Sequence, residues 1–197
     1  MSNKAKFYVY IILSLVLGSI IIQPIIQHSI TLQSGELFLF PTAPVDPYDP
    51  FRGKYVQLSF QQTTAPLDIS EPTIRKQKTV YGILSKKSDG TAEIRSIVYS
   101  RPKDKPYLSI PLEKYQMYYH DSSRVVDYSF PFDRFYMNEK LAPIAEQIYR
   151  ENQRDSSRAL LAVRIKDGHG TIEDLLIDGQ PIFKLSKERL EGKTTQK

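Results

Sequence analysis

The chain has 197 residues with a hydrophobic content of 41%, which fits one membrane span and one domain better than a multi-span membrane protein. Its formal charge of +5 is small and dispersed, unlike the clustered basic stripe of a nucleic-acid-binding protein. The chain has no cysteine, which excludes disulfides, thiolate metal sites, thiol nucleophiles and a lipobox-type lipid anchor.

The first feature along the chain is a run of twenty residues without a formal charge, at 7–26 (FYVYIILSLVLGSIIIQPII). At about 1.5 Å per residue, a helix of this length spans a hydrocarbon layer of about 30 Å. Lys4 and Lys6 precede the run, and the next formal charge is Glu36. The positive-inside tendency therefore predicts a transmembrane helix with its N-terminus in the cytoplasm. Pro24 lies at the far end, where a helix can stop or kink.

A cleaved signal peptide is the competing interpretation of this run. The hydrophobic region of a signal peptide is shorter, about 7–15 residues, and small residues follow it. Here Gly18 and Ser19 lie inside the run. A buried helix of a soluble protein is also disfavoured, because the run is apolar on every face. We therefore expect a retained single-pass anchor in the cytoplasmic (inner) membrane, with the rest of the chain on the extracytoplasmic side.

The rest of the chain carries strand patterns. Residues 55–61 alternate, with Val56, Leu58 and Phe60 on one face, as in a half-buried strand. Two hairpins are predicted around turns that contain Asp-Gly, namely 88–90 and 167–170. Their flanking strands are expected at 79–86 and 91–100, and at 159–166 and 171–177, with further strands at 36–41, 107–112 and 124–136. The two hairpins resemble each other, and both an ancient duplication and chance would explain this.

One helix is expected after the anchor, within 138–153, with its regular part beginning near Ala142. The predicted fold class is an N-terminal transmembrane helix followed by a mainly-β (α+β) domain, an antiparallel barrel or sandwich with one packed helix. The expected organisation is a cytoplasmic stub at 1–6, a transmembrane helix at 7–26, a linker at 27–35, a β-rich extracytoplasmic domain at 36–183 and a flexible tail at 184–197.

The segment 41–60 (PTAPVDPYDPFRGKYVQLSF) has an unusual spacing of prolines. They occur at 41, 44, 47 and 50, which is the three-residue period of polyproline II. In that conformation Asp46, Asp49 and Arg52 share one edge. The segment is expected to be stiff and sided, and to end at Gly53, where the backbone can turn sharply.

These residues carry a family resemblance. TAPVDP, then Asp49, Phe51-Arg52-Gly53, Tyr55, Leu58 and an aromatic at 60 resemble the bacterial GDYXXLXY family. PFDRFYMNE and LLAVRIKDGHGTIEDLLIDG are similar to its aromatic strand and its closing hairpin. The resemblance implies a membrane-anchored chain whose biochemical role is not established. Two positions depart from the signature: Lys54 stands in place of Asp, and Phe60 stands in place of Tyr.

Six residues of this segment form the predicted binding ledge for a partner or ligand: Asp46, Asp49, Arg52, Gly53, Tyr55 and Leu58. Loops carry binding residues disproportionately often, which supports this interpretation, but a proline-rich, Asp-containing lead into a strand is more often architectural. The alternative is architectural. Arg52 then pairs with one of the two aspartates, and Gly53 merely permits a turn into the strand.

No motif points to a metal or a reaction. The histidines His28, His120 and His169 are scattered, and no HExxH, EF-hand, GxSxG or P-loop pattern occurs. We therefore expect no cofactor and no metal. The leading functional hypothesis is a membrane-anchored extracytoplasmic binding or accessory protein of a bacterial envelope, with a membrane or envelope protein as its partner. The alternatives are a hydrolase-like envelope enzyme that uses Asp46 or Asp49, and a purely structural scaffold.

Overall fold

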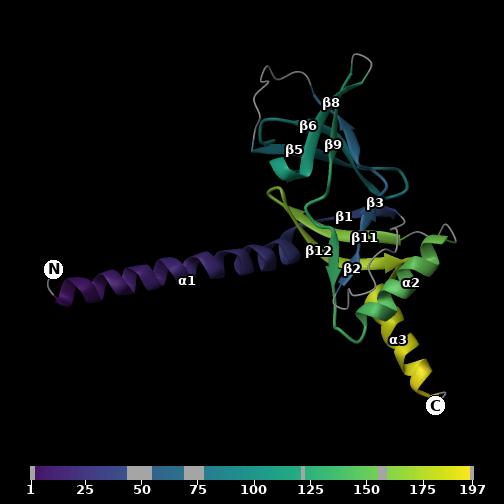
Figure 1. The fold of residues 1–197 in the computed structure, drawn as a ribbon. Coiled ribbons are helices and arrows are strands. Elements are labelled where there is room, and N and C mark those ends of the chain that lie inside the picture. The colour runs from purple at the N-terminus through teal and green to yellow at the C-terminus, as the bar shows by residue number, and fades with distance from the viewer. Residues whose placement is uncertain (1–2, 44–54, 69–77, 121–122, 155–158, 196–197) are drawn as a thin grey trace.

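The computed structural model describes residues 3–43, 55–68, 78–120, 123–154 and 159–195. Its first element is the helix α1 (Asn3–Ser34), which projects away from a β-rich domain as one long rod (Figure 1). The apolar side chains of α1 are exposed along most of its length. By length and composition, this helix is able to cross a membrane.

The predicted linker at 27–35 is helical instead, and α1 passes through Pro24 and ends only at Ser34. No further glycine or proline interrupts the chain before Gly35. The last turns also pack on the domain, where Thr31 is buried. The Lys166 ammonium donates a hydrogen bond of 2.7 Å to the Ser34 hydroxyl. The helix therefore enters the domain as a rigid extension of it.

The sheet next to α1 is antiparallel and has five strands. The predicted hairpin around 167–170 is confirmed, but its turn has two residues where four were expected. These are Asp167 and Gly168, whose φ angles of 51° and 82° are positive, as a type I′ turn requires. The strands are, in order across the sheet, β13 (Gln180–Pro181), β12 (His169–Ile177), β11 (Ala159–Lys166), β1 (Glu36–Ala43) and β3 (Ser59–Phe60).

Two three-stranded sheets form the other part of the domain, above the first sheet in Figure 1. The hairpin around Asp89-Gly90 is confirmed. One sheet has the order β6 (Ala92–Val98), β5 (Thr79–Lys86) and β7 (Tyr107–Pro111), and the other β4 (Thr64–Pro66), β9 (Ser123–Tyr128) and β8 (Tyr115–His120), with the short 3-10 helix η1 (Leu112–Lys114) before β8.

The predicted strand at 124–136 is divided. It forms β9, then an irregular stretch, then β10 (Arg134–Tyr136), which pairs with β2 (Tyr55–Gln57) as a separate two-stranded sheet. Across the described residues the sheets are layered like a sandwich and do not close into a barrel. The mainly-β fold class is therefore confirmed in its sandwich form.

Two helices accompany the sheets where one was expected. The first, α2 (Ala142–Arg154), begins at the predicted residue. The second, α3 (Ile182–Thr195), occupies most of the predicted flexible tail. Packing explains why this segment forms a helix and not a flexible tail, because Leu185 and Leu190 lie against the hydrophobic core. An ion pair of 2.7 Å between Arg189 and Glu151 also ties α3 to α2.

Aromatic rings fill the core where the sheets meet. Phe130 lies at the centre, with ring centroids 4.2 Å from Phe60, 5.0 Å from Phe40, 5.3 Å from Phe132 and 5.4 Å from Tyr128. All five side chains are buried. We call them the inner aromatic cluster. It connects strands that belong to two different sheets, β1 and β3 of the five-stranded sheet and β9 of a three-stranded sheet, and so holds the two parts of the domain together.

Candidate functional site

The signature segment is described from Tyr55 to Phe60, and along it the chain changes partners. Its first half, β2, pairs with β10, and its second half, β3, pairs with β1. Between them the Leu58 N–H donates a hydrogen bond of 2.9 Å to the Asp133 carbonyl. The segment therefore joins the small two-stranded sheet to the five-stranded sheet.

The predicted alternation along this segment is confirmed. Val56, Leu58 and Phe60 are buried, whereas Tyr55 is half-buried. Leu58 is therefore a core residue and has no surface to offer a partner. Of the six ledge residues, Tyr55 is the one that the structure places at the surface. Asp46, Asp49, Arg52 and Gly53 lie outside the described residues.

Tyr55 belongs to a group that we call the outer aromatic cluster: Tyr55, Arg134 and Tyr136. The two phenol rings meet edge to face with centroids 5.6 Å apart, and the Arg134 guanidinium lies 5.0 Å from the Tyr55 centroid. A hydrogen bond with the Tyr136 side chain is the main cause that raises the pKa of Arg134. The guanidinium is thus charged and held in place between two rings.

Exposure distinguishes this cluster from the rest of the domain. Tyr136 is 66% exposed. Among the residues outside α1 whose side-chain exposure the structure describes, Phe183 on α3 is the other large hydrophobic residue that is more than half exposed. Tyrosine and arginine are enriched among the residues that contribute most to protein–protein binding. The cluster therefore has the chemistry of a recognition surface.

A concave pocket of about 580 Å³ lies beside the outer aromatic cluster. Its lining residues include Arg134 and Tyr136, Thr171 and Ile172 of β12, and His28 of α1. His28 follows the predicted span by two residues. If α1 spans a membrane, this pocket opens at the membrane surface.

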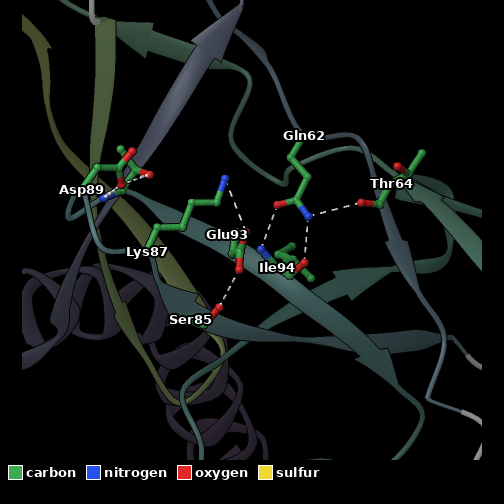
Figure 2. Close-up of polar contacts among 8 residues, drawn as sticks. Gln62, Thr64, Ser85, Lys87, Asp89, Glu93 and Ile94 are labelled. Atoms are coloured by element: carbon green, nitrogen blue, oxygen red, sulfur yellow. Dashed lines mark hydrogen bonds and ion pairs between the residues drawn. The ribbon is translucent and has the colours of Figure 1, made fainter.

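A smaller cavity of about 310 Å³ lies at the other end of the segment, where Phe60, Gln62 and Lys87 are among the lining residues. Its polar groups bond to the protein itself. The Gln62 amide donates to the Ile94 and Thr64 carbonyls and accepts from the Ile94 N–H (Figure 2).

The charged groups near this smaller cavity are also paired. Lys87 and Ser85 both point to the Glu93 carboxylate, at 3.4 Å and 3.2 Å (Figure 2). Because the donors and acceptors of these side chains already have partners, this cavity is a weaker candidate for a binding site than the pocket beside Arg134.

The described residues contain no group of three or more His, Asp or Glu side chains that could hold a metal ion. His28 and His169 lie on different elements, α1 and β12. The described part of the chain thus has no metal centre beside either aromatic cluster.

Sequence reasoning missed Arg134 and Tyr136 as candidates. The stretch PFDRFYMNE was noted as an aromatic strand, but its pattern does not tell which ring is exposed. The decisive information is the register, which places Tyr136 opposite Tyr55 and Arg134 opposite Gln57. A non-local strand pair of this kind has no local signal.

No curated protein and no solved structure matches the chain. The family model described as GDYXXLXY protein matches residues 17–175, from the middle of α1 to β12. That match includes both aromatic clusters and most of the β-rich domain, and the chain therefore belongs to the GDYXXLXY family.

Proposed function

We propose that this chain is a membrane-anchored binding protein of a bacterial envelope, which holds a protein partner at the extracytoplasmic face of the cytoplasmic membrane. The partner contacts the outer aromatic cluster and the adjoining pocket. No reaction is part of this proposal.

The anchor rests on α1. Its exposed side chains from Phe7 to Ile26 are almost all apolar, and such a surface is stable in hydrocarbon and unstable in water. Lys4 and Lys6 lie at the N-terminal side of the span, which supports a cytoplasmic N-terminus. The body of the chain is then extracytoplasmic.

The main observation that supports binding is the exposed ring of Tyr136, which is held against Arg134 and Tyr55. Burying a large aromatic side chain that is already fixed by its neighbours costs little conformational entropy on association. The adjoining pocket gives a partner side chain a concave surface, with the Arg134 charge at its edge. A protein segment that presents an acidic or aromatic side chain fits this combination.

The rigid junction between α1 and the domain would also fix the position of the binding surface relative to the membrane. Lys166 binds the last turn of α1, and the Arg164 guanidinium donates a hydrogen bond of 3.3 Å to the Gly35 carbonyl. A partner held beside His28 would therefore stay at a constant height above the membrane. We infer a membrane or envelope protein rather than a freely diffusing one. The ledge residues Asp46, Asp49, Arg52 and Gly53, which directly precede β2, stay a prediction for the same contact.

The test is site-specific photo-crosslinking in native membranes with the full-length chain. A photoreactive amino acid at Tyr136 should give a discrete adduct, and the same amino acid at Phe183 is the matched control, since both side chains are more than half exposed. Arg134→Ala should reduce the adduct at Tyr136 several-fold without lowering the amount of protein. Equal adducts at the two positions, or none at Tyr136, would contradict a binding surface there.

A further inference from the structure

The strand β12 has an outer edge that the described residues cover only in part. Its inner edge pairs with β11 along nearly its whole length. On the outer edge, β13 pairs with Leu176 and Ile177 at one end. In the turn before the other end, the Ser109 N–H of β7 donates a hydrogen bond of 2.9 Å to the Gly168 carbonyl. No described strand pairs with the stretch between these ends.

The turn between β11 and β12 shows which backbone groups face the open stretch. In a two-residue hairpin the residues that flank the turn, here Lys166 and His169, form a hydrogen-bonded pair, and the two kinds of pair alternate from there. The backbone groups of Thr171 therefore point to β11, whereas those of Gly170 and Ile172 point outward. Neither Gly170 nor Ile172 has a hydrogen bond on that side to another described residue.

The next outward donor along this edge is already satisfied. Ile177 and Gln180 flank the two-residue turn into β13 and form its hydrogen-bonded pair, so Leu175, two residues before Ile177, also faces outward. The Leu175 N–H donates a hydrogen bond of 2.7 Å to the Asp174 carboxylate of its own strand. The open stretch is thus confined to Gly170–Ile172, and these three residues line the pocket beside the outer aromatic cluster.

The strand β10, which also lines this pocket, repeats the pattern. The Leu58 N–H donates a hydrogen bond to the Asp133 carbonyl, and this pair continues the ladder of β2 with β10 by one step. By the same alternation, the backbone groups of Arg134 and Tyr136 point away from β2. They have no backbone hydrogen bond to another described residue on that side. Two open strand edges therefore contribute to one pocket.

The backbone pattern specifies the chemical class of the occupant. Outward N–H and C=O groups that recur at every second residue, about 6.5 Å apart, are complementary to the backbone of another extended chain. A lipid headgroup or a free anion has no such repeat. Adding a strand to an open sheet edge is a common way for a protein to bind a peptide, with main-chain hydrogen bonds supplying affinity.

A buried side chain in the same stretch also lacks a partner. Thr171 is only 8% exposed and lines the pocket. Its hydroxyl has no hydrogen bond to another described residue. Buried polar groups are nearly always hydrogen-bonded in folded proteins, so this hydroxyl favours an occupant that brings polar groups into the pocket.

We propose that the partner presents an extended peptide segment, which adds as a strand to the open edge of β12 inside this pocket and places an acidic side chain beside Arg134. This inference rests on the proposed function and specifies how the partner binds. The acidic side chain follows from the local charges. Asp133 lies 3.7 Å from Lys114 and 3.9 Å from Arg134, so these three residues together carry one positive charge.

Photo-crosslinking from position 136 of the full-length chain in native membranes tests the strand addition. Ile172→Pro removes the outward N–H and blocks the open edge without removing a hydrogen bond to β11. The adduct should fall about fivefold or more, because a backbone hydrogen bond to the partner is lost. Ile172→Ala, which shortens the side chain but keeps the N–H, is the matched comparison and should lose much less. Equal resistance to limited proteolysis shows that both variants are folded.

Hydrogen exchange of the purified adduct is a second measurement, which needs no substitution in β12. The amides of Gly170 and Ile172 should exchange about fivefold or more slowly than in the free chain, whereas the Thr171 amide, already bonded to β11, should change little. Mass spectrometry should find Asp or Glu in the crosslinked peptide.

The outcomes separate this inference from the proposed function. An adduct that persists in folded Ile172→Pro, or unchanged exchange at Gly170 and Ile172, would overturn the strand addition alone. An adduct with lipid or with a second copy of the chain, or no adduct at all, would overturn both.

Discussion

The two ends of the signature segment have opposite surroundings although they are only five positions apart in the sequence. Tyr55 lies at the surface beside Arg134 and the exposed ring of Tyr136. Phe60 lies in the inner aromatic cluster, 4.2 Å from Phe130. One end thus presents phenol hydroxyls and a charged guanidinium at the surface, and the other end is packed against the apolar rings of Phe130 and Phe132.

The comparison shows that the signature combines two physical tasks in one short segment. The ring at 60 is required for packing, which explains why Phe can stand where the family pattern has Tyr. The ring at 55 holds a guanidinium, and its loss would affect a surface rather than a core. Mutations at the two ends should therefore separate stability from binding.

The largest effect is expected for Phe60→Ala. The substitution removes a ring from a buried cluster and leaves a cavity, which costs about 3–5 kcal/mol of unfolding free energy. Chemical denaturation of the full-length chain in detergent, followed by tyrosine fluorescence, measures this. Phe60→Tyr, which keeps the ring, is the matched control and should lose far less. A loss below about 1 kcal/mol for Phe60→Ala would show that the ring is not packed as described.

The strand pattern of the signature segment and the two hairpins could be predicted from the sequence because their signals are local. The alternation of Val56, Leu58 and Phe60 indicated the buried face, and Asp-Gly marked both hairpin turns. The helix start near Ala142 followed from Pro143, which a helix tolerates in its first turn. Each of these features depends on residues close together in the chain.

The candidate site could be predicted only in part because it depends on pairing between distant residues. Tyr55 was identified, but Arg134 and Tyr136 reach it through the register of β10 with β2. The helical end of α1 and the order of α3 were missed for the same reason. Lys166 binds Ser34 across 132 positions, and Arg189 binds Glu151 across 38, and neither contact has a local sequence signal.

The next largest effect is expected at Gln62, which follows the inner end of the segment. Its amide makes three hydrogen bonds to backbone groups of Ile94 and Thr64. Gln62→Ala leaves these groups without their partner and should cost about 1–2 kcal/mol. Gln62→Glu should cost at least as much, because its carboxylate would face two carbonyl oxygens. The measurement is the same denaturation experiment.

Gln61→Ala is the control for Gln62, since the Gln61 side chain is exposed and donates to the Thr42 carbonyl at 3.2 Å. It should change stability less than Gln62→Ala. If both substitutions have the same effect, the amide of Gln62 does not link the signature segment to β6 as the structure indicates.

A smaller effect is expected at the outer end. Tyr55→Ala removes one edge-to-face ring contact and one cation–π contact at the surface, together about 1 kcal/mol. In the Tyr55→Ala variant, the crosslinking yield from a photoreactive group at position 136 should fall several-fold. Arg134 and the residue at 136 lose the ring that positions them. Tyr55→Phe should keep both properties. A stability loss as large as that of Phe60→Ala would remove the distinction between the two ends.

The smallest effect at neutral pH is expected for Tyr128→Phe in the inner aromatic cluster. The buried Tyr128 hydroxyl has no hydrogen-bond partner among the described residues, so its removal should leave stability unchanged or raise it by up to about 1 kcal/mol. Burial, with a contribution from Glu93, raises the pKa of Tyr128 well above its ordinary value. The folded state therefore retains a proton that the unfolded state loses above about pH 10.

The pH dependence of Tyr128→Phe gives the sharper measurement. A group whose pKa is higher in the folded state contributes its full stability below the unfolded value and loses it as the pH rises beyond that value. The unmodified chain should thus lose stability between about pH 10 and pH 11 more steeply than Tyr128→Phe. Tyr55→Phe, at the exposed end, should leave that slope nearly unchanged. Equal slopes for the unmodified chain and Tyr128→Phe would mean that water reaches the inner aromatic cluster. The two ends of the signature segment would then differ in their packing and not in their access to water.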